Sequence, residues 1–174
     1  MERLDRIYNY YQKFKMALLF ISGVGIFGMT FYITIDVLWR NFAPTALVGT
    51  YEIVQYYFMP TIILLSMGYA FASGVMPRIV AFVNRLPKGG QRVMGIVLPI
   101  VDLIFCAVMG FLSTEYAVQA TADQLTFICG THLLPVWQMY YLVSLAYVMI
   151  AIEDIFVLIR NIKTGSSDVL YRKQ

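Results

Sequence analysis

The chain has 174 residues, of which 60% are hydrophobic and only 13% are charged, with a formal net charge of +3. Typical globular domains contain roughly 45–50% apolar and about 25% charged residues. A soluble fold of this size could not bury so much apolar side chain behind so few charges. Composition therefore excludes an ordinary soluble enzyme, a nucleic-acid-binding protein and a disordered chain. We predict an integral membrane protein that contacts lipid and binds no nucleic acid.

Four apolar runs are long enough to cross the hydrocarbon core, which takes about 20 helical residues. Each run must be helical because lipid offers no hydrogen bonds to the backbone. We predict an all-α integral membrane protein whose membrane domain covers residues 16–160. Its four transmembrane helices are expected at about residues 16–38, 53–76, 93–114 and 133–153.

Two segments outside these spans have apolar residues at helical spacing with basic residues between them, namely residues 1–15 and residues 78–86. This pattern is typical of short amphipathic helices that lie on a membrane surface. We therefore expect an amphipathic N-terminal arm and a second interfacial helix. The fourth helix is expected to continue as EDIFVLIRNIK, and residues 161–174 to form a cytoplasmic tail.

The first connection between spans contains Arg40 and Glu52, with Asp36 just before it. A local ion pair of Arg40 could fix the hairpin of the first two spans, or these charges could bind an external partner. The third connection is acidic, with Glu115 and Asp123. These two residues are either solvated loop charges or, with Arg40, candidates for docking a partner protein.

The second span contains Ser66, Ala70 and Gly74 at intervals of four, with Gly68 on a neighbouring face. Small residues at this spacing let helix backbones approach closely. The pattern predicts close helix packing, either within the chain or against another protein.

Asp102 interrupts the third span ten residues after Arg92, which places it about 15 Å along the helix and near the membrane midplane. An acid there costs several kcal/mol unless it is paired or protonated. No lysine or arginine lies inside the four apolar runs to pair with it. Asp102 is either part of a proton or cation relay, or a carboxylate that is hydrogen-bonded to hydroxyls or to a helix of a partner protein.

The lysines and arginines predict the orientation. Twelve of the 13 lie in the N-terminal arm, in the second connection or after the fourth span, and only Arg40 lies in the other two connections. The positive-inside rule then puts both termini in the cytoplasm. Trp39 and Trp137 fall at the outer interface, where amphipathic rings are preferred.

The chain offers little for catalysis. Its two cysteines do not form a CxxC pair, its one histidine cannot ligate a haem from both sides, and P-loop, GxSxG and HExxH patterns are absent. We therefore expect no metal site, no cofactor and no enzymatic activity. One function remains open from the residues alone, a stand-alone four-helix proton-coupled exporter that uses Asp102.

Four stretches of the chain resemble one membrane protein family. They are DVLWRNF at residues 36–42, the acid Glu52, LSMGYAFASGVMPRIVAFVNRLP at residues 65–87, and LPVWQMYY at residues 134–141. Their order and spacing are similar to those of the small membrane subunit, the Q component, of tripartite ATP-independent periplasmic (TRAP) transporters. The resemblance covers roughly residues 16–160.

This resemblance implies a non-enzymatic subunit in the bacterial inner membrane. In such systems a large M subunit carries the sodium and substrate sites. A periplasmic binding protein delivers an organic acid, often sialic acid or a dicarboxylate. The Q subunit is similar to a scaffold that braces the M subunit and helps to dock the binding protein. We expect Arg40 and Glu52 to organise the outer hairpin.

Overall fold

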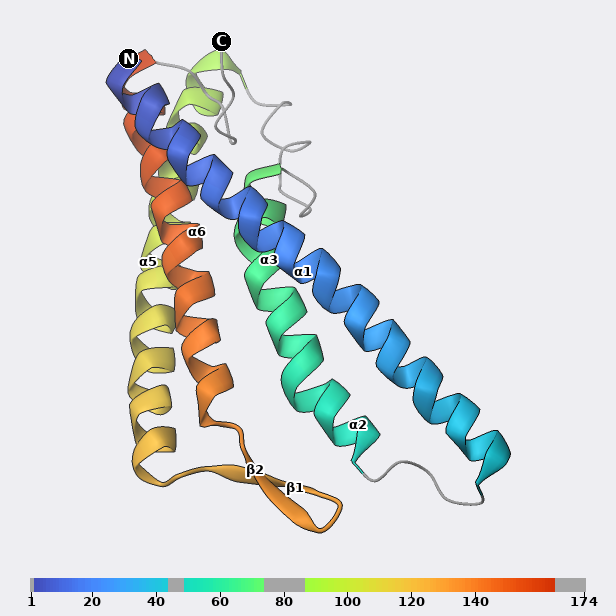
Figure 1. The fold of residues 1–174 in the computed structure, drawn as a ribbon. Helices are drawn as coiled ribbons and strands as arrows, with labels where there is room; N and C mark the ends of the chain where they lie inside the picture. Colours follow the sequence, from blue (N-terminus) through green and yellow to red (C-terminus); the bar gives the residue numbers. More distant parts are fainter. Residues whose placement is uncertain (1, 44–48, 74–86, 165–174) are drawn as a thin grey trace.

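The computed structural model describes residues 2–43, 49–73 and 87–164 (Figure 1). Its elements are α1 (Glu2–Phe42), α2 (Thr50–Ile53), the π-helix η1 (Val54–Phe58), α3 (Met59–Ser73), α5 (Lys88–Ala122), β1 (Thr126–Cys129), β2 (His132–Pro135) and α6 (Trp137–Thr164). Four helical segments of the described residues are long and apolar enough to cross a membrane, with α2, η1 and α3 forming one of them. The prediction of four transmembrane helices is confirmed.

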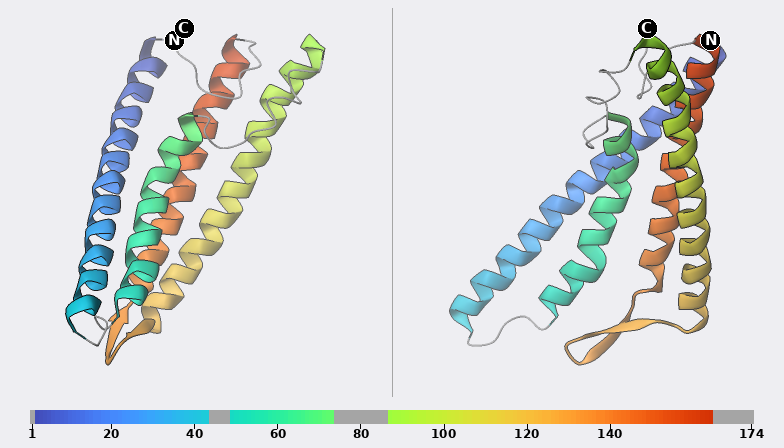
Figure 2. Two further views of the ribbon diagram at one scale, coloured as in Figure 1. Left: turned by 90° about the vertical axis from the view of Figure 1, so that its right-hand side faces the viewer. Right: turned by 180° about the vertical axis from the view of Figure 1, so that it is seen from behind.

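The helices form an open row. Neighbours pack side by side in the order α1, α3, α6 and α5 (Figure 2), and the closest packing is between α5 and α6. We call the end where α1 begins and α6 finishes the terminal end, and the end that carries β1 and β2 the hairpin end. At the terminal end α1 crosses α6, whereas toward the hairpin end the α1–α3 pair diverges from the α5–α6 pair (Figure 1).

Three helices, α1, α5 and α6, are longer than the spans predicted for them. α1 has 41 residues, or about 60 Å, and the expected N-terminal arm is continuous with the first span. α6 runs on to Thr164, which confirms that the fourth helix continues through EDIFVLIRNIK. The interfacial helix expected at residues 78–86 lies outside the described residues.

The third connection differs from the expected loop. α5 continues to Ala122 because EYAVQATA contains no helix breaker, and it ends where Gln124 adopts a φ of 47°. A short antiparallel hairpin follows, with Ile128 opposite Leu133 and a turn at Gly130, whose φ is 60°. The fourth span therefore begins at Trp137 rather than Leu133, because residues 132–135 form β2. The apolar run alone did not distinguish this strand from the start of a helix.

Small residues bring neighbouring helices close together. Gly68 on α3 is buried against α6, and a Cβ atom there would lie 2.7 Å from Cε and 3.3 Å from Cβ of Met149. Between α1 and α3, the Ser22 hydroxyl donates a 2.7 Å hydrogen bond to the Ile62 carbonyl. One turn later Gly25 also lies against Ile62.

The Gly68 contact predicts a selective effect of size. Gly68→Leu should lower the thermal unfolding midpoint of the purified chain in detergent, because overpacking of this kind costs about 1–3 kcal/mol. Gly23→Leu is the matched control, since a Cβ at Gly23 would meet nothing within 4 Å. Equal midpoints for the two variants would show that α3 and α6 do not approach closely at Gly68.

Candidate functional site

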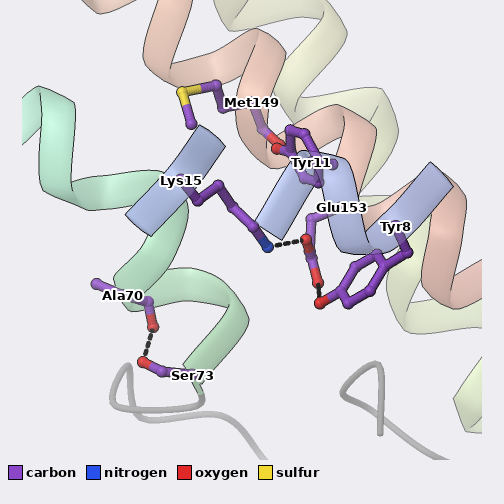
Figure 3. Close-up of polar contacts among 7 residues, drawn as sticks. All are labelled: Tyr8, Tyr11, Lys15, Ala70, Ser73, Met149 and Glu153. Carbon is purple, nitrogen blue, oxygen red and sulfur yellow. Dashed lines mark hydrogen bonds and ion pairs between the residues drawn. The ribbon is translucent and has the colours of Figure 1, made fainter. Parts of the chain in front are cut away.

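A buried polar cluster joins α1 to α6 near the terminal end (Figure 3). Tyr8, Tyr11 and Lys15 are spaced by three and four residues, so they share one face of α1. Lys15 Nζ lies 2.5 Å from Glu153 Oε2, and the Tyr8 hydroxyl donates to Glu153 Oε1 at 2.7 Å. The Tyr11 hydroxyl donates a 2.5 Å hydrogen bond to the Met149 carbonyl. We call these five residues the α1–α6 clamp.

The clamp is buried, and both oxygens of its carboxylate are hydrogen-bonded. Lys15 and Glu153 are each only 1% exposed, and both carboxylate oxygens of Glu153 accept a hydrogen bond from α1. Lys15 Nζ also lies 4.6 Å from the centre of the Tyr11 ring and 5.0 Å from that of Tyr8. These contacts can all form at only one axial position and rotation of α1 relative to α6. The clamp therefore sets where α1 crosses α6.

A second buried polar contact joins α5 to α6. Pro99 lies inside α5 and has no N–H, so it cannot bond the carbonyl of Gly95, four residues earlier. The Asn161 amide donates a 2.7 Å hydrogen bond to that carbonyl. Asn161 is 1% exposed, and an unbonded carbonyl in such a place would be costly. The Asn161 side chain on α6 thus supplies the hydrogen bond that the Gly95 carbonyl of α5 cannot receive from Pro99.

The hairpin is fastened to the start of the second span. Tyr57, in η1, donates a hydrogen bond from its hydroxyl to the Pro135 carbonyl, and the Tyr56 ring stacks on Phe127 with 4.6 Å between centroids. The π-helix precedes Pro60, whose ring and missing N–H disturb the preceding turn. The result is that two consecutive tyrosines contact the hairpin.

Gly49 allows the chain just before α2 to lie close to Cys129 of the hairpin. It adopts a φ of 88°, and a Cβ atom there would lie 2.1 Å from Cys129 Sγ. Both the left-handed backbone and the space demand glycine.

The structure places the predicted charges of the first connection as follows. Arg40 binds Asp36 one turn earlier, with Nη2 at 2.7 Å and Nε at 3.0 Å from Asp36 Oδ2. This pair joins two turns of α1 and does not bridge the connection to the second span. Glu52 lies in α2 and is half-buried.

The three candidate docking residues are not gathered into one patch. Glu115 and Asp123 are exposed at the hairpin end of α5, whereas Arg40 is in the last turn of α1. The ends of these two helices lie at opposite sides of the row in all three views (Figures 1 and 2).

The small residues of the second span serve different surfaces. Gly68 packs against α6. Ser66 and Ala70 lie two residues before and after it, which at about 100° per residue puts them on the opposite side of α3. Both are half-buried. Gly74 lies outside the described residues.

Asp102 is exposed on the side of α5. Within the described residues it has no hydrogen bond or ion pair with the clamp residues. The structure thus does not pair the acid predicted in the third span with the buried base that it contains, Lys15.

Sequence reasoning missed the clamp and Asn161. Lys15 and Glu153 bound the first and fourth apolar runs at the same end, so their equal depth could have been inferred. Their pairing could not, because it depends on the rotation of each helix. Pro99 leaves the Gly95 carbonyl without its helical N–H donor, so the sequence predicts that another donor lies nearby. Only the fold shows that this donor is Asn161.

A shallow groove runs along one helix of the row. The groove along α1, of about 570 Å³, is lined by six residues of that one helix, including Val24, Phe27 and Phe31, so it is a surface depression. The described residues also contain no group of three His, Cys, Asp or Glu side chains that could hold a metal ion.

The fold defines a multi-pass membrane protein in which polar contacts position the helices. A protein-family model for the DctQ component of tripartite ATP-independent periplasmic transporters matches residues 29–164. The chain belongs to this family of transporter subunits. Comparisons with curated proteins and with solved structures found no match.

The clamp predicts strong coupling between its charges. Lys15→Met and Glu153→Leu should each destabilise the chain by about 3–5 kcal/mol, because each leaves an uncompensated buried charge. The double variant should lose much less than the sum, which unfolding in detergent would measure. Lys13→Met, at an exposed lysine of the same helix, is the control and should be nearly neutral. Additive losses would show that Lys15 and Glu153 do not pair.

Proposed function

We propose that the chain is the small subunit of a sodium-coupled, binding-protein-dependent secondary transporter that imports organic acids such as sialic acid or dicarboxylates. The observation that carries this proposal is the open row of helices. Only 6% of the most apolar window of α1 is buried, and even in α6 the share is 33%. So much uncovered helix surface suits a scaffold that is completed by a larger membrane partner.

The partner of this scaffold is the large transport subunit. A carrier that moves its substrate site across the membrane needs a neighbour that stays in place. The clamp, the Asn161 contact and the fastened hairpin all hold the helices of this chain in one arrangement. Ser66 and Ala70, on the side of α3 opposite α6, are small enough to let α3 pack closely against a neighbouring helix.

The hairpin end is proposed to face the periplasm of a bacterial inner membrane, with both termini in the cytoplasm. The distribution of basic residues supports this orientation. In it, Glu115 and Asp123 at one side, and Arg40 at the other, give the binding protein two separate contact points. Arg40 is held by Asp36, so its guanidinium is positioned for such a contact.

A stand-alone proton-coupled exporter fits the geometry less well. A relay acid should line a path through the protein, as intramembrane acids of pumps do. Asp102 is exposed and is not enclosed by the helices of the described row.

The proposed orientation can be tested by cysteine labelling in a Cys106→Ala/Cys129→Ala background. Thr131 and Arg6 are exposed near the hairpin and terminal ends, respectively. Thr131→Cys should react with a membrane-impermeant maleimide in intact cells, and Arg6→Cys only after permeabilisation. The reverse pattern would invert the proposed topology.

The proposed function predicts obligate cooperation. The tagged chain should co-purify with the co-expressed large subunit, and proteoliposomes containing both should take up the organic acid only with a sodium gradient and the binding protein. Vesicles with the large subunit alone are the control and should be inactive. Proton-driven export by this chain without the other components would refute the proposal and favour the exporter.

A further inference from the structure

Three polar side chains share one flank of α1, beside the face that forms the clamp. Asn9, Gln12 and Lys13, together with Met16, line a shallow depression of about 260 Å³. Lys13 is exposed, and its Nζ lies 6.0 Å from the centre of the Tyr10 ring. Within the described residues, the side chains of Asn9, Gln12 and Lys13 form no hydrogen bond or ion pair. Two amides and one ammonium are therefore free to donate hydrogen bonds.

The charge of this flank is positive and is not balanced locally. The nearest acid to Lys13 along α1 is Asp5, eight residues earlier, or about 12 Å along the helix axis. The other lysine of this stretch, Lys15, is already paired with Glu153. The flank therefore presents one unpaired cation and two amide donors, which is a set that suits an anion with several oxygens.

The clamp shows how deep this flank lies in the membrane. Glu153 follows Trp137 by 16 residues, or about 24 Å along α6, and Trp137 begins the span at the hairpin end. Because the hydrocarbon core is about 30 Å thick, the pair of Glu153 with Lys15 lies close to the boundary of the core at the terminal end. Asn9 and Lys13 lie beyond Lys15 in that direction, so they are at the depth of the lipid headgroups.

The other uncovered flank of α1 at this level is apolar. Ile7, Tyr10 and Phe14 are 60%, 67% and 51% exposed. A polar basic flank next to an exposed apolar one is typical of a helix at the membrane interface. The anions at this depth are lipid phosphates, toward which a lysine side chain extends from the edge of the hydrocarbon core. Anionic lipids attract such a lysine more strongly than neutral lipids do.

We propose that Asn9, Gln12 and Lys13 bind the phosphate group of an anionic phospholipid in the leaflet at the terminal end. The Lys13 ammonium supplies the charge, the two amides donate hydrogen bonds to phosphate oxygens, and Met16 lies beside the start of the acyl chains. This inference goes beyond the proposed function and does not require the large subunit. It assigns a lipid site to the helix segment whose position the clamp sets.

The test is native mass spectrometry of the full chain, purified in detergent and titrated with phosphatidylglycerol. The wild type should bind this lipid more tightly than phosphatidylcholine, which carries a phosphate but no net charge. Lys13→Met should weaken phosphatidylglycerol binding about fivefold, with the unfolding midpoint in lipid-free detergent unchanged. Arg92→Met removes an equal charge from an exposed position near the start of α5, so it is the matched control and should bind like wild type.

A second variant separates a lipid site from attraction by net charge. Asn9→Ala/Gln12→Ala leaves the charge unchanged and should weaken phosphatidylglycerol binding at least about threefold, because it removes both amide donors. Inorganic phosphate at the concentration of the lipid should not displace it. Equal binding of the two lipids, equal losses in Lys13→Met and Arg92→Met, or full binding by the double variant would overturn the inference. Displacement by inorganic phosphate would also overturn it, because the site would then be one for free anions.

Discussion

The arrangement of the helices depends on the contact that Glu153 makes with α1. In lipid, apolar packing gives little net drive for helices to associate, because acyl chains are as apolar as the side chains they replace. Polar contacts and close backbone approach therefore decide which helices meet. Glu153 is buried and binds both Lys15 and Tyr8. Moving α1 away would therefore leave a buried carboxylate without its partners. The helix whose apolar window is least buried, α1, is held where it crosses α6 by this carboxylate and by the hydrogen bond from Tyr11 to the Met149 carbonyl.

The two ends of the row are secured in different ways. At the terminal end, buried charges and amides bind α6 to both α1 and α5. At the hairpin end, where the helix pairs diverge (Figure 1), the hairpin packs on the start of the second span through Phe127, Tyr56 and Tyr57. This contact adds to the α3–α6 packing at Gly68 and to the hydrogen bond from the Thr61 hydroxyl to Met139 Sδ. The hairpin therefore provides a further contact between the two helix pairs where they diverge.

Much of this fold could be predicted from the sequence, because run length and the lack of water in the membrane fix the number of helices. The polar contacts between the helices were harder to predict from the sequence. The depth of Lys15 and Glu153 follows from the apolar runs, but their pairing depends on how each helix is rotated. The strand at residues 132–135 could not be distinguished from the start of a helix by hydropathy, because Leu133 and Leu134 extend the apolar run in either case. Arg40 had two acids within reach in sequence, and only the helix geometry selects Asp36 over Glu52.

The polar residues within the spans now divide into two kinds. Ser22, Glu153 and Asn161 bind groups on neighbouring helices of the same chain, so they explain how the row holds itself together. Asp102 is exposed at the edge of the α5–α6 contact, one turn from the buried Cys106, and has no hydrogen bond or ion pair within the described residues. Polar contacts hold the row together while most of its apolar helix surface stays uncovered, and this combination supports the proposed role as a scaffold for a larger membrane partner.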